Sequence, residues 1–455
     1  MTTYYVGIGG DDGATGLSWA LRKLTLNGAE NIPVAGDDIV YVGPGTYREL
    51  LTCDVSGTAG HTITYIGDVD GSHTDGVGGV VRITGSNDDL TETRNQCFLV
   101  GERNYRTFKG FTLDLVAAQV VLIYAGTNLT VSDCYFGATN NIGIYASDCT
   151  SGHLIERCIF FGLNSYNIWL ITAATVDNTG IVIQNNVFIG SNNGIRIAGI
   201  GGMTIKNNVF IACSTALRCS SSISGGQVNN VNNNIVTCCT LGFNAAAAGD
   251  FTDNYNALFG NGTNYTGTVI GANSNAYPPL FNPPILLSGY RYPWNFPELA
   301  PYSPLRAIAG TGEATDDLFG RARPATSAKK SWGAVQFSDT LRETTTKRTG
   351  TASIKFEDAG RHQIFVPTTN VSTTFSVWTY FEADYTGTKP QMVIKQPGVA
   401  DTTVVATGNV STWELLTTTL TPAASPGYCV VELVSNNTAA TAATDDVFFD
   451  DLTVV

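Results

Sequence analysis

Apolar and polar residues alternate with a period of two along much of the chain from residue 108 to residue 256, and the alternating unit recurs. Each unit has an apolar residue at position 0, a conspicuous residue at +3 and an apolar residue at +5; NNVFI, for example, occurs twice, 22 residues apart. The units start at Phe108, Val131, Ile155, Ile183, Ile205, Val231 and Phe251, with spacings of 23, 24, 28, 22, 26 and 20 residues. Units this short cannot close a core of their own, so the pattern predicts a solenoid.

The alternation within each unit predicts short strands joined by tight turns. Position +3 often holds Asn beside a second Asn; Asn tolerates the left-handed backbone of such turns, and stacked Asn side chains can hydrogen-bond from coil to coil. Stacking places each strand about 4.8 Å from its copy in the next coil. Leucine-rich and ankyrin repeats contain a helix and motifs that are missing here, and a propeller needs units of roughly 40 residues or more. We therefore expect an all-β chain with a parallel β-helix.

A second module follows the repeats. Proline-rich sequence at 276–301 ends the ladder pairing, because Pro lacks the N–H that a ladder needs. After about residue 337 the chain has longer alternating strands that are typical of a β-sandwich. The expected segments are 1–35, an N-terminal strand and cap helix; 36–275, the parallel β-helix; 276–336, its closing segment; and 337–455, the β-sandwich.

Composition supports an all-β protein and excludes some functions. The chain has 49 Gly and only 14% charged residues, and its net charge of −13 argues against nucleic-acid binding, which needs a basic face. No stretch is apolar enough for a membrane span, and the N-terminus shows no signal peptide. The ten Cys lack zinc-site spacing, and several occupy equivalent places in the repeat. We expect small buried thiols and maturation in a reducing cytoplasm.

Four motifs carry a resemblance to a known family. They are YYVGIGGDDGATGLSWALRKLT at the N-terminus, GDDIVYVGPGTYRE at 36–49, SPLRAIAG at 303–310, and DLFGRARP at 317–324 followed by WGAVQF. With the repeats, they resemble the pectate-lyase-like right-handed parallel β-helices over roughly residues 3–337. GTASIKFE and DVFFDDLTVV resemble the first and last strands of carbohydrate-binding-module-like jelly rolls. The family includes lyases, hydrolases, epimerases, phage tailspikes and inactive proteins, so the resemblance implies a fold and leaves the chemistry open.

One strand of each coil is expected to face an external groove. Aligning LIYAG (122–126), GIYAS (143–147), NIWLI (167–171), GIRIA (194–198), ALRCS (216–220) and LGFNA (241–245) gives a column of outward residues. The column contains Tyr124, Tyr145, Trp169, Arg196, Arg218 and Phe243. Aromatic rings suit sugar binding, and arginines suit the carboxylate or sulfate groups of a glycan. Alternatively, the aromatic residues pair across strands or are covered by a loop or a neighbouring subunit.

The column disfavours hydrolysis, which needs two carboxylates roughly 5 to 10 Å apart. The nearest acids, Asp133, Asp148 and Asp177, lie in turns, where Asp more often shapes the backbone. The family resemblance implies instead a lyase in which Arg or Lys acts as base beside Ca²⁺, which makes Arg196 and Arg218 the catalytic candidates. No calcium cluster accompanies them, so we assign no metal ligand, and Ca²⁺ is the only cofactor under consideration.

Three hypotheses remain open. In the first, the protein is a tailspike-like virion protein, expected as a homotrimer, that binds a host polysaccharide, with or without cleaving it. The second is a free polysaccharide lyase that acts on uronic-acid glycans by β-elimination. The third is a non-catalytic structural protein or adhesin. All three place the protein on a virion or at an extracellular surface.

Overall fold

A computed structural model describes the fold in two compact units, residues 1–337 and 338–455. In the first unit it describes 1–277 except 31, 33–35, 138–140, 149–150, 173–179, 224–226 and 269, and then 279, 299, 305, 313–318, 320, 323, 333 and 334. In the second unit it describes 348 and 353–454 except 357–359, 368–371, 384, 386, 396–400, 409, 422–427 and 438–445. Within these ranges, no helix is both long and apolar enough to cross a membrane.

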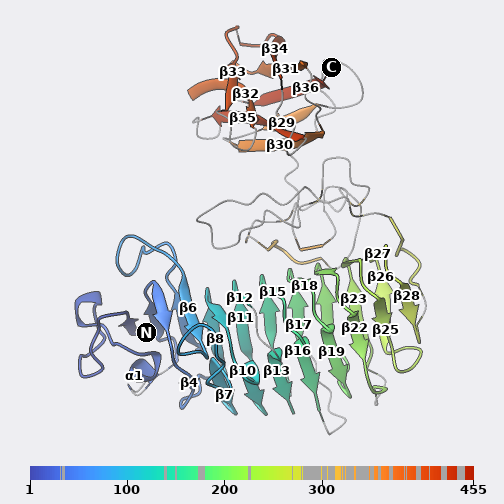
Figure 1. Ribbon diagram of the computed structural model, residues 1–455. Helices are drawn as coiled ribbons and strands as arrows, with labels where there is room; N and C mark the ends of the chain where they lie inside the picture. The colour runs from blue at the N-terminus through green and yellow to red at the C-terminus, as the bar shows by residue number, and fades with distance from the viewer. Residues whose placement is uncertain are drawn as a thin grey trace. The chain divides into compact units, whose positions relative to one another are not determined.

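The first unit is a parallel β-helix of stacked coils, and each coil adds one strand to each of three parallel sheets (Figure 1). Sheet 1 contains β1 (Thr3–Val6), β2 (Ile39–Val42), β5 (Ile63–Gly67), β8 (Arg106–Lys109), β11 (Leu129–Ser132), β14 (Leu154–Glu156), β17 (Val182–Gln184), β20 (Thr204–Lys206), β23 (Asn229–Asn232) and β26 (Phe251–Asn254). Sheet 2 contains β3 (Gly45–Tyr47), β6 (Val81–Thr84), β9 (Thr112–Asp114), β12 (Tyr135–Phe136), β15 (Ile159–Phe161), β18 (Val187–Ile189), β21 (Val209–Ile211), β24 (Ile235–Thr237) and β27 (Ala257–Phe259). Sheet 3 contains β4 (Leu51–Thr52), β7 (Phe98–Gly101), β10 (Gln119–Tyr124), β13 (Ile142–Ser147), β16 (Tyr166–Ile171), β19 (Asn193–Ala198), β22 (Thr215–Cys219), β25 (Leu241–Asn244) and β28 (Thr263–Thr266).

The predicted register is confirmed for six of the seven repeat units. The first residues of these units are direct partners in sheet 1, in the order Phe108, Val131, Ile155, Ile183, Ile205 and Val231. The seventh unit was aligned wrongly: Val231 pairs with Asp253, and Phe251 pairs with Asn229. The true repeat is two residues later, and the Asn at its +3 position is Asn256 rather than Asn254.

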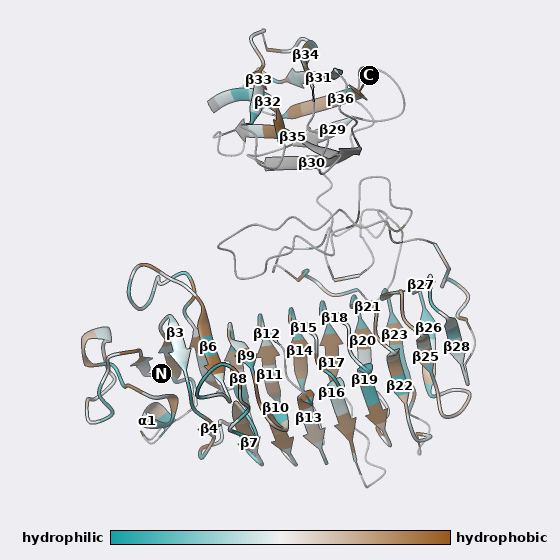
Figure 2. Cartoon of the chain, viewed as in Figure 1, coloured by the Kyte–Doolittle hydropathy of each residue, from teal (hydrophilic) through white to brown (hydrophobic). Residues whose placement is uncertain are grey.

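Apolar side chains fill the interior of the coils. The rings of Phe136, Phe160, Phe188 and Phe210 stack in successive coils at centroid distances of 4.4, 5.0 and 4.7 Å. All four rings are fully buried. Figure 2 shows hydrophobic residues along the strands of the three sheets. A single repeat unit cannot close a core alone, and it is stabilised by stacking its side chains on those of the neighbouring coils.

The two residues of each Asn pair between sheets 1 and 2 have different roles: the first forms the turn, and the second links successive coils. The first Asn of each pair is left-handed, with φ of 55° at Asn185 and 53° at Asn207. The second Asn is buried and joins the coils: Asn186 donates from Nδ2 to Asn208 Oδ1 over 3.1 Å, and Asn208 donates likewise to Asn234 over 3.0 Å. Each Oδ1 also accepts the backbone N–H of the Asn one coil earlier. Buried amides that are fully paired in this way stabilise one register.

Cysteines continue these inter-coil stacks. Cys134 and Cys158 occupy the ladder position in the two coils before Asn186, and both are buried. The eight cysteines whose side chains the structure describes are free thiols, and all but Cys238 are buried. The expectation of small buried thiols is therefore confirmed for the seven buried cysteines and wrong for Cys238. Cys149 and the side chain of Cys429 lie outside the described residues.

The N-terminal end of the β-helix is closed by the expected cap helix. The helix α1 (Leu26–Glu30) follows the short 3-10 helix η1 (Trp19–Leu21). The Glu30 carboxylate is buried, pairs with the guanidinium of Arg106, and accepts a hydrogen bond from the hydroxyl of Tyr65. Removal of one partner from such a buried pair is strongly destabilising, so this contact ties the cap to the coils.

A closing segment, defined as the described residues between 299 and 334, covers the outer face of sheet 2. Outward residues of five successive strands form a buried apolar cluster with it. The cluster contains Ile159, Val187, Val209, Ile235 and Ala257 from the sheet, and Leu299, Leu305, Leu318 and Ala334 from the segment. Arg323 fastens the segment, because its Nη2 donates to Asn185 Oδ1 (3.0 Å) and to the carbonyl oxygen of Gly333 (2.8 Å).

The second unit is the expected β-sandwich of two four-stranded antiparallel sheets. One sheet contains β29 (Ile354–Phe356), β36 (Val447–Val454), β31 (Thr373–Phe381) and β34 (Glu414–Leu420). The other contains β30 (Gly360–Pro367), β35 (Tyr428–Asn437), β32 (Gly387–Lys395) and β33 (Thr402–Val405). Its core joins Phe375 and Val377 of the first sheet to Met392 and Leu433 of the second.

Candidate functional site

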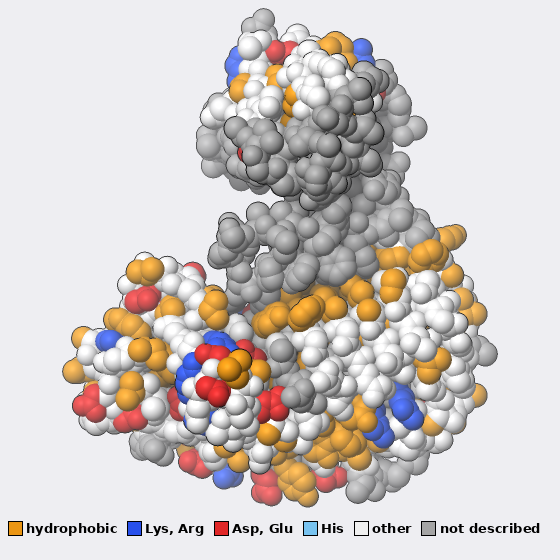
Figure 3. Space-filling view, in the orientation of Figure 1, with side chains coloured by type: hydrophobic (Ala, Val, Ile, Leu, Met, Phe, Trp, Pro, Cys, Tyr) orange, Lys and Arg blue, Asp and Glu red, His pale blue; other side chains and the backbone are white. Residues whose placement is uncertain are grey.

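The outer face of sheet 3 presents one aligned row of side chains, which we call the outer row. Strand pairing places its members directly above one another in successive coils. They are Leu99, Leu122, Tyr145, Trp169, Arg196, Arg218, Asn244 and Thr266. Each member from Leu99 to Asn244 lies between two buried residues, so the row points away from the core. Figure 3 shows Lys and Arg side chains gathered over β19 and β22, next to hydrophobic ones.

Four of the six predicted column residues belong to the outer row, and two do not. Phe243 is buried at 1% exposure and pairs with Leu217, so Asn244 takes the outward position. A slip of one residue along a strand turns the side chain to the opposite face. Tyr124 is 51% exposed, but it pairs with Ser147, and Leu122 occupies its expected place beside Tyr145.

The middle of the outer row is a packed cluster of three rings and one cation. The ring centroid of Trp169 lies 5.0 Å from that of Tyr145, with 70° between the ring planes, and 5.0 Å from that of Tyr166. The guanidinium carbon of Arg196 lies 4.8 Å from the centre of the Trp169 ring and 5.1 Å from that of Tyr166. These are cation–π distances. Because the rings are steeply inclined, they do not form the single flat platform that an aromatic row would suggest.

Hydrogen bonds hold Arg196 in this position. Its Nη1 donates to the Tyr166 hydroxyl over 2.6 Å, and its Nε donates to Ser220 Oγ over 3.3 Å. Sequence alignment missed Tyr166, since it precedes Trp169 by three residues and strict alternation would put the two on opposite faces. In β16 both Asn167 and Ile168 are buried, which brings Tyr166 and Trp169 to the same side.

Arg218 has different surroundings. It is exposed, and it makes no hydrogen bond or ion pair to any side chain within the described residues. Its neighbours in the outer row are Arg196 in the preceding coil and Asn244 in the next. By contrast, Arg48, Arg82 and Arg106 all pair with carboxylates. The outer row thus offers one guanidinium that is available to a ligand.

The row itself contains no carboxylate, and the turn acids have local partners. Asp148 is left-handed, with φ of 52°, and its Oδ2 accepts a hydrogen bond from the Ser147 hydroxyl. Asp177 lies outside the described residues. No group of three His, Cys, Asp or Glu side chains with metal-binding geometry is found among the residues described. The site therefore offers no ligand set for Ca²⁺, and we assign no chemical step to a metal.

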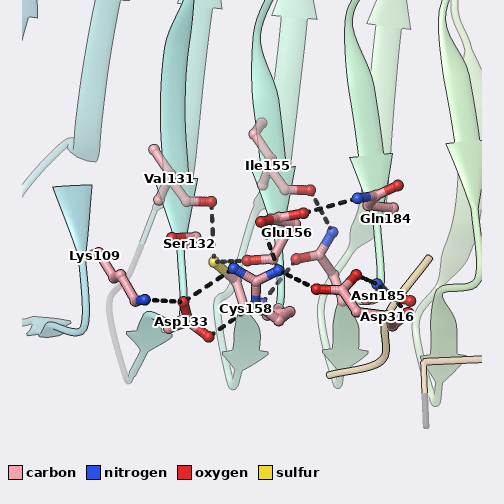
Figure 4. Close-up of polar contacts among 12 residues, drawn as sticks. Lys109, Val131, Ser132, Asp133, Ile155, Glu156, Cys158, Gln184, Asn185 and Asp316 are labelled. Atoms are coloured by element: carbon pink, nitrogen blue, oxygen red, sulfur yellow. Dashed lines mark hydrogen bonds and ion pairs between the residues drawn. The ribbon is translucent and has the colours of Figure 1, made fainter. Parts of the chain in front are cut away.

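Asp133 belongs to an ion-pair cluster on sheet 1 and its turns (Figure 4). Arg157 contacts three carboxylates: Asp133 at 3.0 Å, Glu156 at 2.7 Å and Asp316 at 2.6 Å. Lys109 lies 3.8 Å from Asp133. Since Asp316 is part of the closing segment, this cluster fastens that segment to the coils. The contacts account for Asp133 as a structural residue.

No protein-family profile and no curated protein matches this sequence. Several solved structures resemble the chain. Pectate lyase Pel9A shares 16% identity, with 74% of this chain and 97% of that one covered and a TM-score of 0.43. A rhamnogalacturonan lyase shares 14% identity, with 61% of this chain and 88% of that one covered and a TM-score of 0.39. Family 16 Carbohydrate Binding Module-2 matches 25% of this chain over 83% of its own length, with 15% identity and a TM-score of 0.21.

The solved structures that resemble this chain thus include a pectate lyase and a rhamnogalacturonan lyase. Likeness at this level says nothing about the ligand, which the side chains of sheet 3 have to indicate. Tyr145 and Trp169 can contact the apolar faces of sugar rings, and Arg218 can donate paired hydrogen bonds to an anion. With no carboxylate in the outer row, hydrolysis by a carboxylate pair has no basis there.

Proposed function

We propose that the protein binds a polysaccharide along the outer row of sheet 3. The observation that carries this proposal is the direct register of Tyr145, Trp169, Arg196 and Arg218 in four successive coils. The coils repeat every 4.8 Å or so, which is close to the length of one sugar residue in an extended glycan. A chain lying along the solenoid axis would therefore meet one row residue at each step.

Binding to a panel of bacterial surface polysaccharides, measured by affinity electrophoresis, tests this proposal. Trp169→Ala is expected to weaken binding at least tenfold, because it removes the ring that contacts Tyr145, Tyr166 and Arg196. Phe259→Ala is the matched control, since Phe259 is an aromatic residue of sheet 2 with 41% exposure. Equal loss of binding in both variants would place the glycan elsewhere.

We further propose that this binding serves a tailspike-like virion protein that assembles as a homotrimer. Free thiols at all described cysteines support maturation in a reducing compartment, as expected for a protein assembled inside a host cell. Mass measurement of the full chain in solution tests assembly. A stable trimer is expected, and a monomer at micromolar concentration would contradict the virion role while leaving glycan binding intact.

A second candidate function is a polysaccharide lyase. Two adjacent arginines without a carboxylate in the row favour it over a hydrolase. In β-elimination a base removes the proton next to a uronate carboxylate, a double bond forms, and the glycosidic oxygen leaves and takes up a proton. Arg218 would neutralise the carboxylate, and Arg196 is the other candidate catalytic residue.

Ultraviolet absorbance of the unsaturated ends would detect the lyase reaction on uronic-acid glycans. Activity that disappears in Arg218→Ala would support a lyase. Activity that survives both Arg196→Ala and Arg218→Ala would reject this site. Binding without any turnover would reject the lyase and leave the tailspike-like protein and the adhesin, which the mass measurement separates.

A further inference from the structure

The two arginines of the outer row are neighbours in register but differ in environment. Arg196 is held between Trp169 and Tyr166 and donates to two hydroxyl groups. Arg218 is exposed, with Asn244 as its uncharged neighbour on the other side. Equivalent backbone positions therefore support two different roles.

Two like charges at paired positions of adjacent strands, whose backbones are roughly 4.8 Å apart, repel each other, and this costs energy unless another contact offsets it. For Arg196 the offset comes from the faces of two rings and the Tyr166 hydroxyl. For Arg218 no described side chain supplies one. In a chain with a net charge of −13, a cation retained without a carboxylate partner is a natural position for an external anion.

The row changes in character along the solenoid axis. From β7 to β16 its members are Leu99, Leu122, Tyr145 and Trp169. From β22 to β28 they are Arg218, Asn244 and Thr266. The first half suits the apolar face of an uncharged sugar, and the second half suits an anionic group with neighbouring hydroxyls. Arg196 lies at the junction.

We propose that the outer row recognises a glycan that carries both neutral and anionic residues, an inference that rests on the proposed polysaccharide binding. The neutral residue contacts Tyr145 and Trp169. The anionic residue, through a carboxylate or a sulfate, contacts Arg218 and Asn244. Arg196 is a positioning residue that sets the angle of the Trp169 ring and does not contact the anion.

A glycan array that contains neutral, fully acidic and mixed neutral–acidic polysaccharides tests the inference on the full chain. The mixed polysaccharides are expected to bind best, and the carboxylated and sulfated members of the array identify the anion. Arg218→Gln should reduce affinity for them about tenfold and flatten its dependence on salt concentration. The same glycan with its carboxylates reduced to alcohols should bind wild type and Arg218→Gln equally.

Arg196 is tested by comparing two substitutions. Arg196→Gln should weaken binding of the acidic glycan and of its reduced form by the same factor, with an unchanged urea midpoint. Arg196→Lys should restore part of the affinity, since it keeps a cation over the rings. A loss confined to the acidic glycan in Arg196→Gln, together with no loss in Arg218→Gln, would overturn the assignment of roles.

Failure of this inference is distinguishable from failure of the proposed function. If only neutral or only fully acidic glycans bind, and Trp169→Ala still abolishes binding, the row binds polysaccharide but the inferred mixed composition of the glycan is wrong. If Trp169→Ala leaves binding of every glycan unchanged, the proposed site itself is wrong.

Discussion

The outer faces of sheets 2 and 3 belong to the same coils, but among the described residues the closing segment buries one outward apolar row of sheet 2, whereas the outer row of sheet 3 stays at least partly exposed. On sheet 2 the outward Ile159, Val187, Val209 and Ile235 are buried under the closing segment. On sheet 3 the outward Tyr145 and Trp169 remain partly exposed, and Arg218 is exposed. Outward apolar residues thus do not by themselves indicate a binding site. What covers them decides whether they contribute to stability or to recognition.

The sharpest test of this contrast compares one arginine from each face. Arg323→Met should lower the free energy of unfolding by about 4 kcal/mol, because Asn185 Oδ1 and the Gly333 carbonyl lose a charged donor in a buried site. Arg218→Met should change it by less than about 0.5 kcal/mol. Urea unfolding followed by circular dichroism measures both. Similar values for the two variants would remove the distinction between the faces.

An apolar substitution on each face is expected to give the next largest difference. Ile235 is 1% exposed and its Cδ1 lies beneath Gly333, so Ile235→Ala should cost about 3 kcal/mol by leaving a cavity under the closing segment. Leu122→Ala, in the partly exposed outer row, should cost less than about 1 kcal/mol. Thermal unfolding of both variants checks this. A larger loss in Leu122→Ala would mean that the outer row is also covered.

His153 supplies a test that depends on pH. This residue is 1% exposed, and burial lowers the pKa of its imidazole from 6.5 to about 4. Above pH 6.5 both folded and unfolded states are neutral there. As the pH falls from 6.5 towards 4, only the unfolded state gains the proton, so stability should fall by on the order of 2 to 3 kcal/mol.

Other groups also titrate in this range, so the measurement compares urea midpoints of the parent and of His153→Gln at two pH values: about 7.5, above the ordinary pKa, and about 4.5, between the lowered and the ordinary pKa. The difference between the two proteins should shrink or reverse at the lower pH. A constant difference would show that His153 takes up a proton in the folded state as readily as in the unfolded one.

The smallest effect is expected for the exposed end of the ion-pair cluster. Lys109 has a half-exposed side chain and lies 3.8 Å from Asp133, so Lys109→Ala should change stability by less than about 0.5 kcal/mol. Arg157→Met, which breaks contacts to Asp133, Glu156 and Asp316, should cost clearly more. Equal effects in urea unfolding would argue that Asp316 does not fasten the closing segment.

Most of the β-helix was predictable because its pattern is local. The alternation at Phe108, Val131 and Ile155 predicts which side chains point inward, and recurrence of the same motif predicts the register. The error at Phe251 arose where an apolar residue two positions early satisfied the same pattern. Coils before Phe108 were not recognised as repeat units, although Tyr65 pairs with Phe108 as a repeat member would.

The candidate site was only partly predictable. The outward positions of Tyr145, Trp169, Arg196 and Arg218 were predicted correctly, because each stands between two buried residues of its strand. Phe243 was misplaced by one residue, and this was enough to exchange an outward aromatic residue for Asn244. Contacts within the cluster, above all that of Arg196 with Tyr166, depend on side-chain conformations that no spacing rule contains.

Sequence alone therefore determined the architecture: stacked coils, an Asn ladder, and a chain in which one row breaks its apolar rhythm with two arginines. Only the tertiary structure decided which outward row stays open. The closing segment lies more than 100 residues from the Asn207 turn that it covers, and its Ala314 donates a backbone N–H to Asn207 Oδ1. Alternation depends on residues that are neighbours in the sequence, so it can be read from the sequence. Burial of an outward row depends on a segment that is distant in the sequence, so it is seen only in the folded chain.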